Sequence, residues 1–473
     1  MLRASVAAER AGVPSVSLIT PGFERQALAT GRGLGFDGMK LAVLDAHPDS
    51  LSHDELIAGF LANTVPQILA GLTAALDDDS AVAVDEPQAL DVVASGTIDE
   101  IIDLFHDRGW SDGLPIVPPT RERVEEFLAV TGHDPWRVIG VAKPGGREVT
   151  VWSVAVNGVM AGCKPEYLPV LLTAAEILCG SQYGVEHSGN TTGSDALMVL
   201  DGPAITELGF NFGPGSHREG HRANTATGRW LRLFLRNVCG FTGDEHDKAT
   251  YGNPAKPVLA EDMEALADIG WAPLSGEFGF GAEESALTIA RINSTIMIGS
   301  VYGATPEAVV PYLADGLCRV TGWDLTHVYG LGGGHYRPLL IISPMIARVF
   351  GKAGWSKQQL KDALFAAARI PAWKFEALIG EWSNLTAGRP KLYDLAAEGL
   401  VPPVFGESAD PERLVPIVTE ASKFLIAVAG DRNRANALAM SNDGLHGMWT
   451  TRFVDTSPSQ DLACLVDGEA CAT

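Results

Sequence analysis

Apolar residues recur along this chain in two alternating patterns, which predict an α/β fold. In residues 1–76, continuous apolar runs at 13–19 and 39–44 alternate with stretches of helical periodicity, the last of which predicts a long helix over 54–76. Such runs are typical of parallel strands buried on both faces. Two strands make too small a sheet to be stable alone. We therefore predict a partial Rossmann-like unit, whose remaining strands come from the rest of this chain, from another polypeptide, or from a longer reading frame.

Changes in composition divide the rest of the chain into a linker, a larger domain and a tail. The segment 77–96 is acidic and aperiodic, as linkers often are. A larger α/β domain is predicted over 97–455 and a tail over 456–473. Thr97, with Glu100 three residues later, predicts a capping box at the start of the domain's first helix.

Equal spacings predict an internal duplication in the larger domain. Pro-Glu at 165–166 precedes Pro203 by 38 residues, and Pro-Glu at 306–307 precedes Pro344 by the same 38. Each copy is expected to contain an extended segment, a helix, a strand and a second helix. The extended segments carry one asparagine each, Asn157 and Asn293. We expect two α/β halves related by a pseudo-twofold axis, with a ligand site near their junction.

Histidines fall at matching places in the two copies. His187 and His327 are separated by almost the same distance as the two Pro-Glu pairs, so both are candidate catalytic residues. The segment GLGGGH at 330–335 lacks the strand and helix of a dinucleotide fingerprint. It is interpreted as a tight loop that brings His335 beside the site as a substrate-binding residue.

A glycine-rich loop at 209–222 is the main candidate for substrate binding. It leads into residues 223–238, whose apolar residues recur at helical spacing, so it is predicted to end at a helix N-terminus, where free N–H groups favour an anion. The loop is expected to meet residues near Cys163. Its candidate substrate-binding residues are His217, Arg218, His221, Arg222 and Asn224. A surface loop whose basic residues pair with nearby carboxylates would give the same pattern.

A second polar loop is predicted at 430–448, after a strand at 424–429. Open α/β sheets tend to bind ligands beyond strand ends. Arg432 and Arg434 are its candidate substrate-binding residues, and His446 lies in the same loop.

Cys163 is the candidate nucleophile. A glycine precedes it, Lys164 adjoins it and a helix start follows, features that can lower a thiol pKa. Its small apolar neighbours equally describe a buried packing cysteine. The six cysteines lack CxxC spacing and the histidines lack HxH or HExxH spacing, so neither a metal site nor a disulfide framework is expected. No nucleotide motif occurs, which leaves the cofactor unknown and an external thiol reductant possible.

The charge balance narrows the class of partner. The chain has 58 acidic and 35 basic residues, a net charge of −23, which disfavours nucleic acid and anionic membranes. The most apolar window, 286–301, is interrupted by Arg291 and Asn293, so no membrane span is expected. The N-terminus lacks a signal-peptide pattern, and we expect a cytoplasmic protein with reduced thiols.

Several segments resemble the bacterial UGSC family, whose N-terminal Rossmann-like domain carries a (seleno)cysteine-Gly-Ser-Cys site. AERAGVPSVSLITPGF and DAHPDSLSHDELIAGF resemble the end of that domain. DGLPIVPPTRERVEEFLAVTG, LDGPAITELGFNFGPG and RANTATGRWLRLFLRNV resemble the large domain that often follows it. The resemblance implies thiol or selenol chemistry. This sequence contains no Cys-Gly-Ser-Cys, so that centre, if needed, must sit on a separate subunit.

Three functional hypotheses follow. The first is an enzyme that acts on a small anionic metabolite by thiol-dependent redox chemistry. The second is a thiol-dependent lyase or hydrolase. The third is a non-catalytic subunit that completes the pocket of a partner chain carrying the reactive residue. An oligomer is expected.

Overall fold

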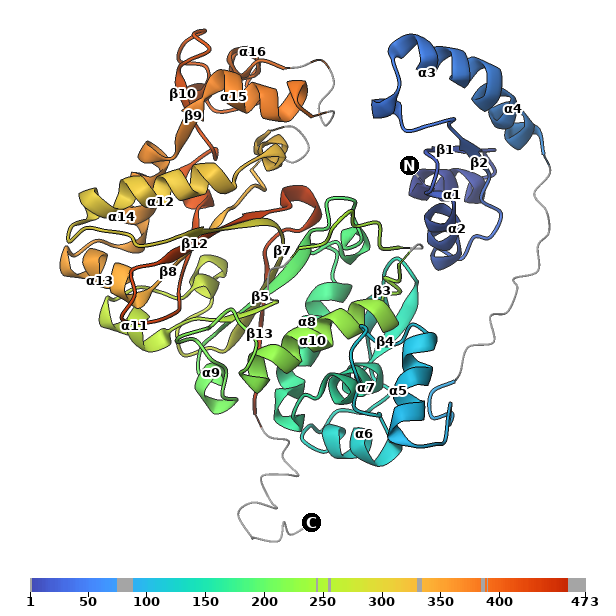
Figure 1. The fold of residues 1–473 in the computed structure, drawn as a ribbon, viewed down its shortest axis with the longest axis horizontal. Coiled ribbons are helices and arrows are strands. Elements are labelled where there is room, and N and C mark those ends of the chain that lie inside the picture. Colours follow the sequence, from blue (N-terminus) through green and yellow to red (C-terminus); the bar gives the residue numbers. More distant parts are fainter. Residues whose placement is uncertain are drawn as a thin grey trace.

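The computed structural model describes residues 2–74, 88–243, 246–253, 257–329, 334–383, 388 and 390–457 (Figure 1). The predicted linker and tail therefore lie largely outside the described residues. Residues 88–96 and 454–457 contain neither helix nor strand. Thr97 and Glu100 form the predicted capping box.

The N-terminal unit has the predicted order of elements. They are α1 (Leu2–Arg10), β1 (Ser17–Ile19), α2 (Glu24–Gly33), β2 (Leu41–Val43), α3 (His53–Gly59) and α4 (Val65–Thr73), the last two joined by a π-helical turn. β1 and β2 pair in parallel and form a two-stranded sheet of their own. Among the described residues no further strand joins this sheet, so the larger domain does not complete it.

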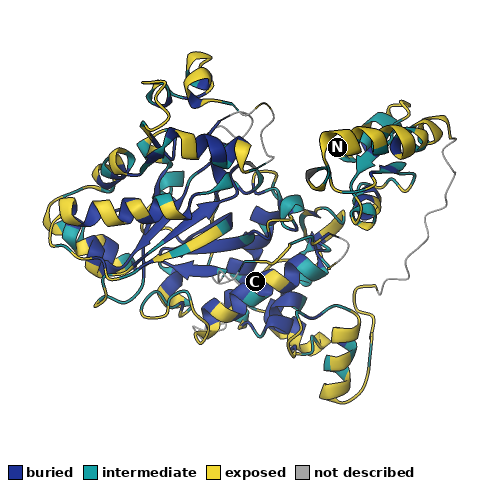
Figure 2. Ribbon diagram, turned by 45° about the horizontal axis from the view of Figure 1, so that its top comes forward, coloured by how far each residue is buried: buried dark blue, intermediate teal, exposed yellow. Residues whose placement is uncertain are grey.

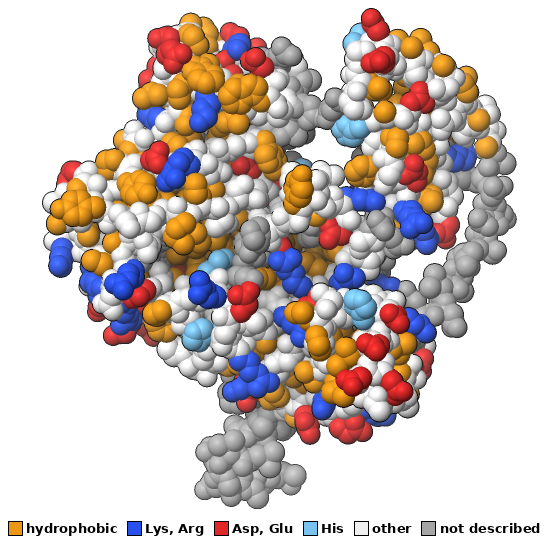
Figure 3. Space-filling view, in the orientation of Figure 1, with side chains coloured by type: hydrophobic (Ala, Val, Ile, Leu, Met, Phe, Trp, Pro, Cys, Tyr) orange, Lys and Arg blue, Asp and Glu red, His pale blue; other side chains and the backbone are white. Residues whose placement is uncertain are grey.

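The helical stretch of α3 and α4 exposes apolar side chains. Leu61 and Leu69 are 62% and 59% exposed, and apolar side chains gather over these helices in Figure 3. By length and composition, the helical stretch His53–Thr73 could cross a membrane. Only 6% of its apolar window is buried inside the protein. Core helices of soluble proteins and signal sequences can have the same length and composition. The predicted cytoplasmic location stays a prediction.

The larger domain combines helices with one extended sheet. Its helices are α5 (Ile98–Asp107), α6 (Arg121–Leu128), α7 (Val151–Ala161), α8 (Leu168–Cys179), α9 (Ala204–Glu207), α10 (Arg222–Asn237), α11 (Met263–Asp268), α12 (Pro306–Val320), α13 (Pro344–Lys352), α14 (Lys357–Ala367), α15 (Ala372–Glu376) and α16 (Leu392–Ala397). Its main-sheet strands are β5 (Asp195–Asp201), β6 (Val258–Ala260), β7 (Ala286–Ile298), β8 (Leu339–Ile342), β11 (Leu425–Val428), β12 (Ala437–Asn442) and β13 (Thr450–Phe453). Two small sheets pair β3 (Val138–Ala142) with β4 (Arg147–Thr150), and β9 (Arg369–Pro371) with β10 (Leu414–Pro416).

The strand pairing of the main sheet follows the same pattern from either edge. It runs β11-β8-β12-β7-β5-β6, with β13 paired to β7. β5 has a parallel neighbour, β6, and an antiparallel neighbour, β7. β8 likewise has parallel β11 and antiparallel β12, and the β7–β12 pair joins the two groups. This arrangement agrees with two related halves, but the duplication itself stays a prediction.

One expectation about the copies is wrong. Asn157 lies in α7, a helix, whereas Asn293 lies in strand β7. Thr150 and Ser153 form a capping box that starts α7. Most of α7 is buried, and a short, mostly apolar run cannot be assigned to helix or strand by periodicity alone.

The sheet curls so that one face packs on itself (Figure 2). Leu197 and Val199 of β5 share a buried cluster with Leu339 and Ile341 of β8. The alternate side chains of these strands point to the opposite face. There, those of β5 pack with α7, α8 and α10, and those of β8 pack with α12, α13 and α14. Two helical layers therefore cover the outer face of one continuous sheet.

Two buried carboxyl groups join strand ends at the curled face. Asp201 ends β5 and Glu261 follows β6, and both are fully buried. Glu261 accepts hydrogen bonds from the N–H groups of Val428 and Leu274, and Asp201 accepts one from Ser275. Burial, and then the neighbouring charge of Glu261, raise the pKa of Asp201 well above its usual range. The site therefore favours the protonated form of Asp201.

This pair predicts a specific pH dependence of stability. Because the folded pKa of Asp201 is raised, its stabilising contribution is full below the unfolded pKa near 4 and is lost as pH rises toward the folded pKa. Asp201→Asn keeps an acceptor for Ser275 and a donor for Glu261 but cannot ionise. From pH 5 to 8, wild type should lose stability relative to this variant by roughly 1 kcal/mol per pH unit until the folded pKa is reached, in urea unfolding.

The exposed Asp268→Asn serves as the matched control and should follow the wild-type profile. Parallel profiles for wild type and Asp201→Asn would show that the site does not favour the protonated form of Asp201.

Candidate functional site

Three histidines from distant parts of the chain meet at one place. His187 ends a 3₁₀ helix (Val185–His187) after α8, and His327 lies in another (Trp323–Val328) after α12. His446 ends a third (Gly444–His446) after β12. The ring centroids of His187 and His446 are 4.3 Å apart, and those of His327 and His446 are 6.2 Å apart. The two candidate catalytic histidines thus face a common third histidine.

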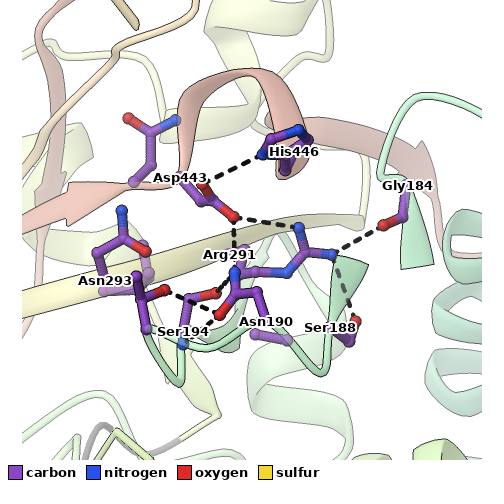
Figure 4. A network of polar contacts seen from close by, with 12 residues as sticks. Gly184, Ser188, Asn190, Ser194, Arg291, Asn293, Asp443 and His446 are labelled. Atoms are coloured by element: carbon purple, nitrogen blue, oxygen red, sulfur yellow. Dashed lines mark hydrogen bonds and ion pairs between the residues drawn. The ribbon is translucent and has the colours of Figure 1, made fainter. Parts of the chain in front are cut away.

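Asp443 lies between His446 and Arg291 (Figure 4). Its Oδ1 is 3.6 Å from His327 Nε2 and 3.8 Å from His446 Nδ1. Its Oδ2 accepts a hydrogen bond from Asn190 at 3.0 Å and pairs with Arg291 at 3.5 Å. Burial alone would raise the pKa of Asp443, but the nearby imidazoles of His327 and His446 and the charge of Arg291 hold this pKa well below its usual range. Asp443 is therefore ionised at neutral pH.

Arg291 of β7 connects this carboxylate to the loop that carries His187. The side chain is fully buried. Its Nη2 donates to the carbonyl of Gly184 at 2.9 Å and to Ser188 Oγ at 3.3 Å. Its guanidinium also lies 4.9 Å from the ring centroid of Tyr183. The guanidinium of Arg291 thus binds other groups of this chain, and these contacts orient the site.

His187 is neutral at physiological pH. Burial, followed by the neighbouring His446 and Arg291, lowers its pKa to about 4. A neutral imidazole has one nitrogen that accepts and one that donates a hydrogen bond. Adjacent Glu186 forms an ion pair at 2.7 Å with Arg3 of α1, so the N-terminal unit contacts the His187 loop.

Two glycines allow the loop after β12 to approach this site. A Cβ on Gly444 would overlap the ring of His327, and a Cβ on Gly447 would overlap the Arg291 side chain. Gly444 also has a φ of +47°, which disfavours other residues. The sequence Asp443–Gly447 thus holds Asp443 and His446 against side chains from both halves of the sheet.

His335 lies close enough to influence this group. Burial, then the charges of Lys423 and His327, lower the pKa of His335. Its carbonyl accepts a hydrogen bond from Asn442 at the end of β12. The remainder of the predicted turn, 330–333, lies outside the described residues.

The glycine-rich loop uses its polar groups internally. Arg222 donates through Nε and Nη2 to the carbonyl of Gly162 at 3.1 and 3.0 Å, at the C-terminal end of α7. Asn224 is buried and exchanges two hydrogen bonds with the backbone of Asn211. The predicted helix exists as α10, but its N-cap residue is His221, with no side-chain cap. Arg222 does meet the neighbourhood of Cys163, as a cap on a helix end.

The other three candidate residues of the loop differ in their exposure. His217 is partly buried, and Arg218 and His221 are exposed. The substrate-binding role of these three residues stays a prediction.

The predicted second loop contains a strand. β12 occupies its centre and lies in the middle of the main sheet, because its alternating apolar residues pack on both faces. Arg432 pairs with Asp262 and Glu264, each at 2.7 Å, so it serves an internal ion pair. Arg434 is exposed. Only the end of this segment, with His446, reaches the site.

The described cysteines have unreactive surroundings. Cys163 is buried in the apolar core, and burial raises its pKa far above the usual range despite Arg222 and Arg229 nearby. Burial also raises the pKa of Cys179 to about 11, that of Cys318 to about 12 and that of Cys239 well above its usual value. The described residues therefore offer no activated thiolate. They also contain no group of three His, Cys, Asp or Glu that could hold a metal ion.

Sequence reasoning missed the groups that organise the site. Asp443, Arg291 and Asn190 were not candidates, because each stands alone in the sequence without a motif. A signal was present in DGLHG, an acid and a histidine between glycines just after a strand.

Comparison with known families agrees with the resemblance of the first segment. Residues 1–74, which form the N-terminal unit, match the UGSC family. A search of curated proteins found no match. The match places the similarity in the unit that contacts the His187 loop and leaves the histidine site to be interpreted from its own geometry.

The packing of Gly444 predicts a strong effect of a single methyl group. Gly444→Ala should destabilise the protein by about 1 to 3 kcal/mol, because the new Cβ meets His327 and the backbone is left-handed. Thermal unfolding measures this change. Gly299→Ala is the control, because its Cβ would come no closer than 4.0 Å to any neighbour and its φ is ordinary. Equal melting temperatures would show that the loop does not pack tightly on His327.

Proposed function

We propose that this chain, whose first 74 residues match the UGSC family, is an enzyme that transfers protons on a small anionic metabolite. One observation carries the proposal: His327 and His446 lie against a buried, ionised Asp443, and the ring of His187 lies beside that of His446. A histidine oriented by a carboxylate is a common general acid or base.

The residues suggest separate roles. His446 is 43% exposed on its side chain and has Nδ1 toward Asp443, so its Nε2 is free to exchange a proton with substrate. Asp443 would stabilise the imidazolium formed by that step. His187 stays neutral and can donate a hydrogen bond to an oxygen on which negative charge develops. Lys423, whose charge reaches His335, is a cation beside the site that favours an anionic substrate.

This arrangement favours lyase or hydrolase chemistry over redox chemistry within the chain. Redox turnover through a thiol needs an accessible thiolate, and the described cysteines are buried or have raised pKa values. Thiol-dependent chemistry would therefore use a thiol outside the described residues, such as an external or a partner-borne one. The location expected for such a protein is the cytoplasm.

Proton transfer can be tested without knowing the natural substrate. The protein is incubated in D₂O with small hydroxy and keto carboxylic acids, and exchange of their C–H protons is followed by NMR. His446→Gln and His187→Gln should each slow exchange by about 100-fold or more while keeping the melting temperature. His106→Gln, at an exposed position of α5, is the matched control and should match wild type.

The pH profile adds an independent test. Because the pKa of His187 is about 4, its ionisation should not change the rate between pH 5 and 8. Exchange that is absent from the whole panel, or unaffected by both histidine variants, would contradict acid–base catalysis here.

A second candidate function is a subunit that completes the pocket of a thiol-bearing partner. The two-stranded β1–β2 sheet and the exposed apolar residues of α3 and α4 favour it, since neither is covered by the described residues. The partner would supply strands for this sheet and a Cys-Gly-Ser-Cys segment. It would then stand beside the His187 loop, which the N-terminal unit already contacts.

This alternative predicts an interface on α3 and α4. Leu61→Ser with Leu69→Ser should weaken binding to a Cys-Gly-Ser-Cys chain encoded beside this one by at least tenfold, because two apolar contacts are lost. Leu400→Ser with Leu414→Ser, at sites of similar exposure, is the control. Calorimetric titration measures the affinity. Undiminished binding, or thiol-dependent turnover by this chain alone, would reject the subunit role.

A further inference from the structure

A cavity lies behind the histidine site. Its volume is about 360 Å³, and its walls include Ser188 and Ser194. In Figure 4 these two serines lie on the far side of Arg291 from His446. The cavity is therefore separate from the face of His446 that would meet substrate, and one polar layer stands between them.

The hydroxyl groups on this wall are set to donate hydrogen bonds. Ser188 Oγ accepts from Arg291 at 3.3 Å, and Ser194 Oγ accepts from Asn190 at 2.6 Å. A serine hydroxyl that already accepts a bond keeps its own proton for an acceptor. Oxygen atoms of a ligand are the natural acceptors on the cavity side.

Two guanidinium groups of α10 add positive charge to the same lining. Arg232 and Arg236 stand one helical turn apart and both line the cavity. Arg232 pairs with Asp195, and Arg236 donates to the carbonyl of Gly109 at 3.1 Å. Each guanidinium has five N–H donors, so both retain donors for a ligand. Together with the serines they suit a carboxylate.

The lining also carries a carboxylate available to a cation. Asp112 is held by Arg229 at 2.9 Å, and Asp195 is held by Arg232. Asp247 is exposed and accepts a hydrogen bond from the N–H of Ala249. No ion pair of Asp247 is found in the described part of the chain. A ligand ammonium group would neutralise it.

We infer that this cavity binds a small zwitterion with a carboxylate and an ammonium group, of the size of a free amino acid. The carboxylate contacts the serines and arginines, and the ammonium contacts Asp247. The volume falls in the range of small-molecule sites. A ligand with only a negative group would leave Asp247 without a partner. A ligand with only a positive group would leave the serines and arginines without one.

Occupancy of the cavity reaches the histidine site through hydrogen bonds. Ser194 is bonded to Asn190, Asn190 is bonded to Asp443, and Asp443 faces His446. A ligand that draws Ser194 toward itself changes the bonding of Asp443. The cavity is thus a second site, from which a bound zwitterion changes the surroundings of Asp443 and His446. The zwitterion can bind there without being converted.

The test uses three small probes that differ in the charged groups they carry. L-serine carries both charges, glycerate has a hydroxyl in place of the ammonium, and ethanolamine lacks the carboxylate. Calorimetric titration of the full chain should show serine binding at least tenfold more tightly than either of the others. Adding serine should also shift the side-chain nitrogen resonances of His446 in NMR spectra.

Variants assign the two contacts. Asp247→Asn should abolish the preference for serine over glycerate, and Arg236→Gln should abolish the preference for serine over ethanolamine. The exposed Asp268→Asn, outside the cavity, should change neither. Equal affinities for the three probes, or a serine preference that survives both variants, would overturn the proposed site. Unshifted His446 resonances with serine bound would overturn its connection to the histidines.

Discussion

The buried ion pair of Arg291 and Asp443 is the constraint on which the site depends. Arg291 is on β7 and Asp443 follows β12, the two strands at the centre of the sheet. Both side chains are almost completely buried. Loss of one partner from such a pair leaves an unpaired charge and typically costs about 3 to 5 kcal/mol. The pair thus fixes how the two groups of strands meet.

Everything else at the site takes its position from this pair. Arg291 binds the carbonyl of Gly184, so it sets the loop of His187. Asp443 faces His327 and His446, so it sets the imidazoles from the other side. Gly444 and Gly447 remove the side chains that would keep these groups apart. The low pKa values of Asp443 and His187 follow from one arrangement, in which a carboxylate is surrounded by donors and an imidazole is buried beside a cation.

Local signals in the sequence were reliable where a helix or strand depends on neighbouring residues. The order of elements in the first 74 residues, the capping box of Thr97 and Glu100, and the helix after the glycine-rich loop all followed from short patterns. The assignments failed where an apolar run was short. Residues 151–161 form a helix instead of an extended segment, and the segment predicted as a loop at 430–448 contains β12. In both places burial on all sides removes the periodicity on which such an assignment rests.

The sequence by itself determined the α/β class and the likeness of the first 74 residues to the UGSC family, and its spacing marked His187 and His327. Each of these follows from residues close together in the chain or from a spacing that can be counted. Only the tertiary structure decided that Arg222 caps α7, that Arg432 serves an ion pair, and that Asp443 and Arg291 organise the histidines. These outcomes depend on side chains that meet across more than 50 residues, and the curl of the sheet sets those meetings. The sequence does not distinguish a charged residue that binds a ligand from one that binds a backbone carbonyl or another side chain.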